Sequence, residues 1–185
     1  MFLEFLKSPT TIGAVTPSSD ELARAMVAGI DWEEVRLVVE CGPGTGALTG
    51  RIRERLAPGA RFFAIELNPG FADAFSQRYP DVPLHRGCVS ELPELCRAGG
   101  AAVDVIVSGL PWAAFSPEDQ RRLLGAMHGS LRVGGQLVTF AYRPAASLPA
   151  GRRFRRLLQG TFSRVEVSPT VWRNVPPAFV YRCHK

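Results

Sequence analysis

The chain has 185 residues, 46% of them hydrophobic and 21% charged, which suits one globular α/β domain and is too short for two ordinary domains. No run reaches the roughly 18 apolar residues of a membrane span, and the four cysteines and three histidines lack the spacing of a zinc site. We therefore expect a cytoplasmic protein with reduced thiols and no metal. The net charge of +5 indicates an anionic partner, which can be RNA, an acidic lipid surface or phosphate groups.

Segments typical of strands and helices alternate along the chain, which predicts a parallel sheet with crossover helices. A first helix is expected from about Ser19 to Ile30, where Ser18 and Glu21 have the spacing of a capping box. Strands are then predicted at 35–40, 61–66, 83–86, 103–108 and 133–141, with helices near 46–57, 69–79, 91–97 and 117–131 between them.

The end of the chain departs from this alternation. Two further strands are predicted at 162–170 and 177–183, and the short segment from Trp172 to Pro176 between them cannot form a parallel crossover. An antiparallel hairpin must therefore close the sheet. The sequence predicts a mixed seven-stranded sheet in one domain over 1–185.

A glycine-rich loop follows the first predicted strand. Gly42, Gly44 and Gly46 stand directly before a predicted helix, so a ligand can lie against bare backbone at the helix N-terminus. The spacing also fits the loop that holds a dinucleotide pyrophosphate. Glu40 favours a different ligand, because a carboxylate repels a pyrophosphate and attracts the ammonium and sulfonium groups of S-adenosylmethionine.

A second carboxylate, Glu66, ends the next strand 20 residues after Gly46. There it can accept hydrogen bonds from both ribose hydroxyls of either cofactor. The alternative for Glu40 and Glu66 is an ordinary surface carboxylate at a strand end. The glycines beside them favour ligand binding.

Together, the glycine loop, the acidic strand ends and the terminal hairpin resemble the class I S-adenosylmethionine-dependent methyltransferases over nearly the whole chain. The resemblance implies a Rossmann-like α/β fold, the cofactor S-adenosylmethionine and the product S-adenosylhomocysteine. It also implies a set of cofactor-binding residues in the loops that follow the strands and at the start of the first helix. These are Ser18, Ser19, Glu40, Gly42, Pro43, Gly44, Thr45, Gly46, Glu66, Leu67, Cys88, Val89, Ser108 and Gly109.

The fourth strand ends in the turn Ser108-Gly-Leu-Pro111-Trp112. The turn resembles the Asn/Asp-x-Pro-aromatic turn of enzymes that methylate exocyclic amines of bases, including the ribosomal RNA adenine dimethylases. This resemblance implies that Ser108 accepts a hydrogen bond from the acceptor amine and that Trp112 forms an aromatic wall. The alternative is that Pro111 starts a helix and Trp112 fills the core.

Four segments in the same order resemble a narrower group, the bacterial phospholipid N-methyltransferases, which methylate phosphatidylethanolamine towards phosphatidylcholine at the membrane surface. Besides the turn, they are Gly13 to Met26, Tyr142-Arg143-Pro144 and Arg173 to Tyr181. The resemblance implies that residues 1–30 dock on the membrane and cover the cofactor, with Gly13 to Ser19 as a lid, in front of a catalytic core at 31–185.

The same resemblance implies that Trp112, Tyr142 and Arg143 line the head-group site. We expect Tyr142 to orient the amine, and the rings of Trp112 and Tyr142 to attract the increasingly methylated cation. Arg143 can pair with the lipid phosphate. The alternative for Tyr142 and Arg143 is a strand-end residue followed by a solvated charge.

Two segments have the composition of a membrane-surface helix. In Phe2 to Lys7 the apolar residues fall on one side of a short helix, and in 152–158 Phe154, Leu157 and Leu158 stand among four arginines. Such segments favour docking on an anionic bilayer from the cytoplasmic side. For 152–158, the alternative is a crossover helix that packs its apolar side on the sheet.

Three functions remain open from the sequence. The first is phospholipid N-methylation, and the second is methylation of an RNA adenine, for which the basic segment at 152–156 is a small footprint. The third is a non-catalytic protein that binds the cofactor or a membrane, which Cys88 and Ser108 motivate because other residues are usual at both positions.

Overall fold

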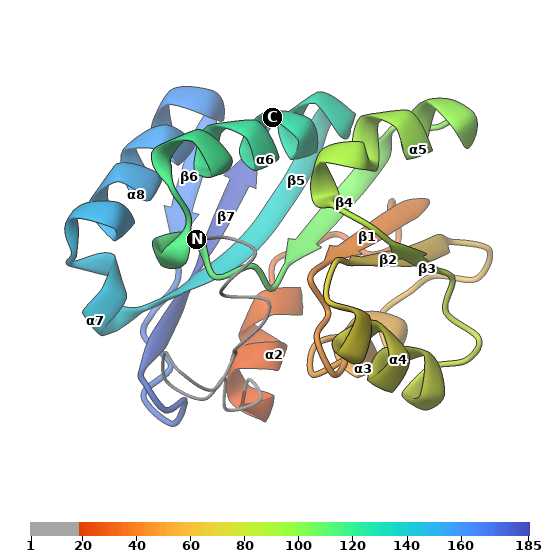
Figure 1. The fold of residues 1–185 in the computed structure, drawn as a ribbon, viewed down its shortest axis with the longest axis horizontal. Coiled ribbons are helices and arrows are strands. Elements are labelled where there is room, and N and C mark those ends of the chain that lie inside the picture. The colour runs from red at the N-terminus through yellow and green to blue at the C-terminus, as the bar shows by residue number, and fades with distance from the viewer. Residues whose placement is uncertain (1–18) are drawn as a thin grey trace.

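The computed structural model describes residues 19–185. The predictions for Ser18, for the segment Phe2 to Lys7 and for nearly all of the lid lie outside the described residues. The described chain forms a seven-stranded sheet in the order β3-β2-β1-β4-β5-β7-β6 (Figure 1). The strands are β1 (Leu37–Cys41), β2 (Arg61–Glu66), β3 (Leu84–Arg86), β4 (Val103–Ser108), β5 (Leu131–Tyr142), β6 (Arg164–Val167) and β7 (Ala178–His184).

The strand directions confirm the predicted fold class. β1 to β5 pair in parallel, whereas β7 runs antiparallel to β5 and to β6. The terminal hairpin therefore closes the sheet, as expected. Its connection is longer than the predicted one and spans residues 168–177.

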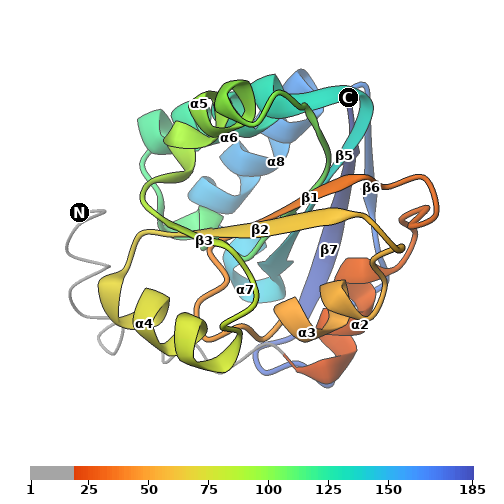
Figure 2. The ribbon, with the colours of Figure 1, turned by 90° about the vertical axis from the view of Figure 1, so that its right-hand side faces the viewer.

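Helices cover both faces of the sheet (Figure 2). One face carries α5, α6 and α8, and the other carries α2, α3 and α4. The short helix α7 follows directly after the end of β5. The bounds are α2 (Asp20–Val27), α3 (Thr49–Arg53), α4 (Pro69–Arg78), α5 (Leu92–Ala98), α6 (Pro117–Ser130), α7 (Arg143–Ala146) and α8 (Pro149–Thr161).

The alternation of side chains along the strands divides the core between the two faces. In β1, Leu37 and Val39 belong to the cluster packed under α5, α6 and α8, while Val38 belongs to the cluster under α2 and α3. All five β1 residues are buried, as expected for a central strand with both faces covered.

Two helices begin later than predicted, the first by one residue and the second by three. The helix expected near 46–57 begins only at Thr49, because Gly44 and Gly46 have positive φ angles of 57° and 82°, which an α-helix cannot accommodate. The first helix is capped by Ser19, whose hydroxyl accepts the Leu22 amide at 3.1 Å, so Ser19 takes the place expected for Ser18.

For 152–158, the sequence left open whether the apolar residues face a membrane or pack on the sheet, and helix α8 distinguishes the two. Phe154 and Leu158 are buried in the core, while Arg152, Arg155 and Arg156 are exposed. The apolar side therefore packs on the sheet, as in a crossover helix, and only the basic side reaches the surface. Within residues 19–185, no helix has the length and apolar character to cross a bilayer.

Candidate active site

The predicted site residues meet where parallel strands end. β1 ends at Cys41 and β4 at Ser108, and these two residues are paired in the sheet. The Gly42 amide donates to the Ile65 carbonyl at 2.9 Å, and the Gly109 amide donates to the Cys41 carbonyl at 2.9 Å. The loops after β1, β2 and β4 are thus fixed to one another at the carboxyl edge of the sheet, where open α/β sheets bind ligands.

The three loop glycines have different roles. A Cβ on Gly42 would lie 2.7 Å from a Leu110 side-chain carbon, and one on Gly46 would lie 2.3 Å from the Tyr79 ring. Both therefore allow close packing within the protein. A Cβ on Gly44 would meet nothing within 4 Å, so Gly44 presents bare backbone to open space, as a cofactor loop requires.

The flanking residues hold this loop in shape. The Pro43 carbonyl accepts the Gly46 amide at 2.9 Å, and the Thr45 carbonyl accepts a hydrogen bond from the Arg78 guanidinium at 3.2 Å. The backbone at Gly44 is therefore braced on both sides before a ligand arrives.

Glu40 lies completely buried beneath the loop. The Thr49 hydroxyl donates to its Oε2 at 2.7 Å, whereas Oε1 has no hydrogen-bond partner among the described residues. Burial raises the pKa of Glu40 to about 8, against the opposing effect of the Thr49 hydrogen bond, and the nearby Glu66 adds to the rise. An unpaired buried carboxylate beside a glycine loop fits a cationic group of a ligand.

Glu66 is also buried, and it closes the loop from the β2 side. Gly44 donates its amide to Oε2 at 3.0 Å, and Asn68 donates its amide to Oε1 at 2.8 Å. Burial raises the pKa of Glu66, and the amides of Asn68, Gly44 and Leu67 oppose the rise. Each carboxylate oxygen has a second lone pair, so Glu66 keeps the capacity to accept from ligand hydroxyls.

The residues after β3 form a small polar turn. The Cys88 amide donates to Glu91 Oε1 at 2.8 Å, and His85 Nε2 lies 2.7 Å from Glu91 Oε2. Arg122 contacts the half-buried Cys88 sulfur at 3.6 Å, while Val89 is buried. Cys88 and Val89 therefore lie at the carboxyl end of β3, as predicted, with the Cys88 amide already engaged.

The acceptor turn packs directly on the glycine loop. A Cβ on Gly109 would lie 2.6 Å from the Gly42 carbonyl oxygen, so only glycine allows this approach. Ser108 is buried, and its hydroxyl accepts the Leu110 amide at 3.4 Å. The Leu110 carbonyl, which precedes the proline, accepts the Trp112 amide at 3.0 Å.

The prediction that Trp112 forms an aromatic wall is wrong. Its side chain is 2% exposed and stacks on Phe154 of α8, with ring centroids 4.4 Å apart. The indole Nε1 donates to the Thr139 hydroxyl at 2.9 Å, and that hydroxyl donates to the Ser108 carbonyl at 3.0 Å. Trp112 therefore fills the core on the α6 and α8 side, the alternative that the sequence left open.

Tyr142 and Arg143 lie at the end of β5, three residues beyond the Ser108 partner Thr139. Tyr142 packs edge-on against Phe140 at 5.3 Å within the cluster on the α2 side, which is the side of Glu40 and Thr49. Arg143 is exposed, and its guanidinium lies 5.7 Å from the Phe179 ring centroid. Tyr142 thus shares a face of the sheet with Glu40, while Trp112 does not.

Three supporting residues were not predicted from the sequence. Thr49 holds Glu40, and Asn68 caps α4 by accepting the Phe71 amide. Asn174 is buried and accepts the Ser19 amide at 2.9 Å, which ties the hairpin connection to the start of α2. Asn68 precedes Pro69 at a helix start, a recognisable cap signal, whereas a contact across 155 positions leaves no local signal.

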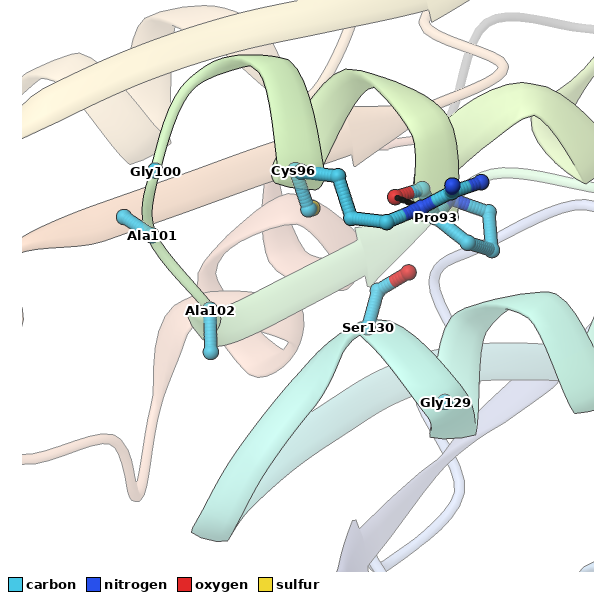
Figure 3. Close-up of a pocket in the computed structure, with 8 residues that line it drawn as sticks. Pro93, Cys96, Gly100, Ala101, Ala102, Gly129 and Ser130 are labelled. Atoms are coloured by element: carbon cyan, nitrogen blue, oxygen red, sulfur yellow. Dashed lines mark hydrogen bonds between the residues drawn. The ribbon is translucent and has the colours of Figure 1, made fainter.

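A shallow hollow between α5 and the end of α6 lies at the other edge of the sheet (Figure 3). Its lining includes Pro93, Cys96, Ala102 and Ser130. Ala102 directly precedes β4 and Ser130 directly precedes β5, so the hollow adjoins the amino ends of the strands. It is therefore separate from the candidate active site.

The fold and the site are those of a class I S-adenosylmethionine-dependent methyltransferase. The fold is a mixed seven-stranded sheet. The site combines a glycine loop after β1, an unpaired buried acid beneath that loop and a second acid at the end of β2. The donor set fits the cofactor: Glu40 suits its cationic end, Gly44 the open backbone, and Glu66 the ribose hydroxyls.

Comparisons with known proteins agree with this class. The sequence profile of the methyltransferase domain family matches residues 38–135. The chain belongs to the S-adenosylmethionine-dependent methyltransferase family, and it is an enzyme that uses S-adenosylmethionine. The alternative of a non-catalytic protein is therefore not retained.

The chain is 33% identical over 184 residues to the ornithine lipid N-methyltransferase of Singulisphaera acidiphila, covering 97% of this chain and 92% of that protein. It is 37% identical over 97 residues to the ribosomal RNA small subunit methyltransferase A of Burkholderia pseudomallei, covering 50% of this chain and 35% of that protein. The O-methyltransferase of Bacillus cereus in complex with S-adenosylhomocysteine shares the fold, with a TM-score of 0.70 at 14% identity over 99% of this chain and 88% of that one.

Proposed function

We propose that this methyltransferase transfers methyl groups to the amine of a membrane aminolipid. The observation that carries the proposal is the relationship to an ornithine lipid N-methyltransferase along 97% of the chain. Phosphatidylethanolamine, to which the sequence motifs point, and ornithine lipid are the two head groups to distinguish. Both present a primary amine on a flexible stem beside an anionic group.

The end of β5 suits such an amine. Tyr142 lies on the face of the sheet that carries Glu40, and burial raises the pKa of its phenol, so the phenol stays neutral and can both donate and accept hydrogen bonds. S-adenosylmethionine supplies the electrophilic methyl group. Because transfer from a sulfonium is an in-line displacement, the work of the protein is to orient the amine and exclude water.

The amine must also be unprotonated to react. A primary amine with a pKa of about 10.4 is mostly protonated at neutral pH, so a base or a chain of waters has to take a proton from the ammonium before the nitrogen can attack. The Tyr142 hydroxyl, or a water beside it, can accept a hydrogen bond from the ammonium. Tyr142 orients the nitrogen in this proposal.

Arg143 is placed for the anionic part of the head group. Its side chain is exposed directly after Tyr142 and packs over Phe179. A guanidinium can bind a phosphate of phosphatidylethanolamine or a carboxylate of an ornithine head group in the same bidentate manner. Arg143 therefore supports recognition of either lipid.

A peripheral location on the cytoplasmic side of the membrane follows from a lipid substrate and is part of the proposal. The exposed basic side of α8, with Arg152, Arg155 and Arg156, supports it through attraction to anionic lipids.

Methylation of an RNA adenine is the second candidate. It is favoured by the partial match to the ribosomal RNA methyltransferase and by the net charge of +5. That match covers only half of this chain, whereas the match to the lipid enzyme covers nearly all of it.

The test of the lipid class is methyl transfer from labelled S-adenosylmethionine to each lipid dispersed in a neutral detergent. We expect label in extracted lipid, with a several-fold preference for one of the two head groups. Tyr142→Phe should lower the turnover on the preferred lipid while cofactor affinity stays unchanged. Absence of label in both lipids would contradict the proposal, and unchanged turnover in the variant would remove the role of the Tyr142 hydroxyl.

A further inference from the structure

Two large apolar side chains are exposed in the connection between β6 and β7, residues 168–177, here called the rim loop. Trp172 is 72% exposed and Val175 is 73% exposed. Exposed apolar side chains gathered in one loop indicate an interaction site.

The rim loop lies at the acceptor end of the sheet. β7 begins at Ala178, which is paired with Tyr142, and the Arg143 amide donates to the Pro177 carbonyl at 2.7 Å. Figure 1 shows the rim loop and α7 at the same end of the molecule, at the lower left. A surface that seats on the rim loop is therefore next to the site where Tyr142 would orient the amine.

The exposure of Trp172 and Val175 is built into the loop. Between them Asn174 is 3% exposed, donates to the Pro176 carbonyl at 2.7 Å and accepts the Ser19 amide at 2.9 Å. Val171 is bridged to Ala178. Because the loop is held from inside at these points, its two apolar side chains are directed outward in a fixed arrangement.

Both the rim loop and helix α8 carry exposed arginines. Arg173 stands between the two apolar residues and is exposed, and its guanidinium lies 3.4 Å from a carboxylate oxygen of the partly exposed Glu21. The sequence from Arg143 to Ser163 contains no Asp or Glu, and the exposed Arg152, Arg155 and Arg156 of α8 form no ion pair with any other residue of the described part. Of these two elements, α8 therefore carries the unpaired positive charge. Tryptophan at the interface together with arginine at anionic head groups is the usual chemistry of a bilayer contact.

We propose that the rim loop docks on an anionic lipid bilayer, with Trp172 and Val175 inserted at the level of the head groups. This docking seats the acceptor end of the sheet on the membrane that supplies the substrate. The inference rests on the proposed lipid substrate and adds to it the element that makes the contact. It involves residues of the described core and is independent of the segment Phe2 to Lys7.

The protein carries its own probe for this docking. It has three tryptophans, and Trp32 and Trp112 are buried, so Trp172 alone can meet lipid. Vesicles of phosphatidylethanolamine and phosphatidylglycerol with brominated acyl chains should quench part of the tryptophan emission of the full chain. The quenching should disappear in Trp172→Phe.

Co-flotation with the same vesicles, unbrominated, measures the affinity. Trp172→Ser should weaken flotation by about tenfold, since partial burial of one large side chain is worth that much. Val133→Ser is the matched control, because Val133 is 87% exposed at the start of β5, at the opposite edge of the sheet, and it should float like the unchanged protein. Cofactor affinity should be equal in all three proteins.

Two results would overturn the docking proposal. One is the absence of quenching by brominated lipid, and the other is equal flotation of Trp172→Ser and the unchanged protein. A Trp172→Ser protein that floats normally but loses a dimer in sedimentation would assign the rim loop to self-association instead. Methyl transfer to lipid in detergent separates the two proposals: its absence in the unchanged protein rejects the lipid substrate, whereas quenching and flotation report docking whatever the substrate is.

Discussion

At the scale of single residues, the site depends on one carboxylate whose ionisation changes with its surroundings. Glu40 is buried, with one oxygen held by Thr49 and the other unpaired. Without a cation beside it, burial keeps the pKa of this carboxyl near 8. A cationic ligand lowers that pKa, so binding releases a proton at neutral pH.

Glu40→Gln tests this ionisation. The folded-state pKa of Glu40 lies above the usual 4.5, so its contribution to the free energy of unfolding is complete below pH 4.5 and is lost as the pH rises towards 8. We expect Glu40→Gln to exceed the unchanged protein in stability by about 1–3 kcal/mol at pH 8.5 and to match it near pH 4.5. Denaturant unfolding at both pH values measures this, and a difference independent of pH would contradict it.

The same substitution separates folding from cofactor binding. Glu40→Gln should weaken S-adenosylmethionine binding, and the affinity of the unchanged protein should rise between pH 6 and pH 8. Calorimetric titrations of both proteins provide the comparison, and a pH-independent affinity of the unchanged protein would remove Glu40 as the partner of the cation.

A second residue, Trp112, shows where local sequence was not enough. The turn Ser108 to Trp112 was identified correctly as the end of β4, but the direction of the indole depends on Phe154 and Thr139, which lie far along the chain. Residue types near a strand end predict that a site is present. They do not predict which aromatic ring faces it.

Trp112→Ala is therefore expected to act as a core substitution, which lowers stability, and not as a change to the substrate site. We expect it to cost about 3–5 kcal/mol of unfolding free energy, and Trp112→Phe to retain most of the stability and the turnover. Thermal unfolding and methyl transfer measured side by side decide this. If Trp112→Ala kept its stability and lost only turnover, the indole would be a substrate wall after all.

At the scale of elements, the glycine loop is the part that the sequence predicted best. Its spacing placed Gly42, Gly44 and Gly46 after β1, and the structure divides them into two packing positions and one open position. The start of α3 was predicted too early, because a helix pattern does not reveal that Gly44 and Gly46 adopt positive φ. The exposure of the apolar side chains in the rim loop was also not predicted, since it depends on the contact between Asn174 and Ser19.

A pair of alanine substitutions separates the two kinds of glycine. Gly44→Ala should cost about 1–2 kcal/mol for its left-handed backbone and weaken cofactor binding, since its Cβ enters the open space. Gly46→Ala should destabilise the fold more, because its Cβ collides with the Tyr79 ring at 2.3 Å. Melting temperatures and cofactor titrations provide the comparison, and equal losses of stability in both variants would contradict this division.

At the scale of the whole molecule, the sheet brings together residues that the chain keeps apart. Glu40, Glu66 and Tyr142 reach one edge of the sheet because parallel strands all end there. The mixed sheet, the closing hairpin and the cofactor class were predicted from the sequence, because the alternation of strands and helices, the short connection near residue 174 and the glycine loop are local patterns. The order of the strands was not predicted, since it depends on pairing between distant segments. In the proposed function, the substrate depends on the shape between β5, α7 and the rim loop, which is set by contacts between distant segments.

The most direct measurement is therefore the destination of the methyl group. Purified protein is incubated with labelled S-adenosylmethionine and a mixture of total RNA and aminolipid vesicles that contain anionic lipid, and lipid and RNA are then extracted separately. We predict label in the lipid fraction, reduced by high salt because anionic vesicles attract the arginines of α8. Label in RNA alone would contradict the lipid function and would make the turn from Ser108 to Trp112 part of a base-binding site.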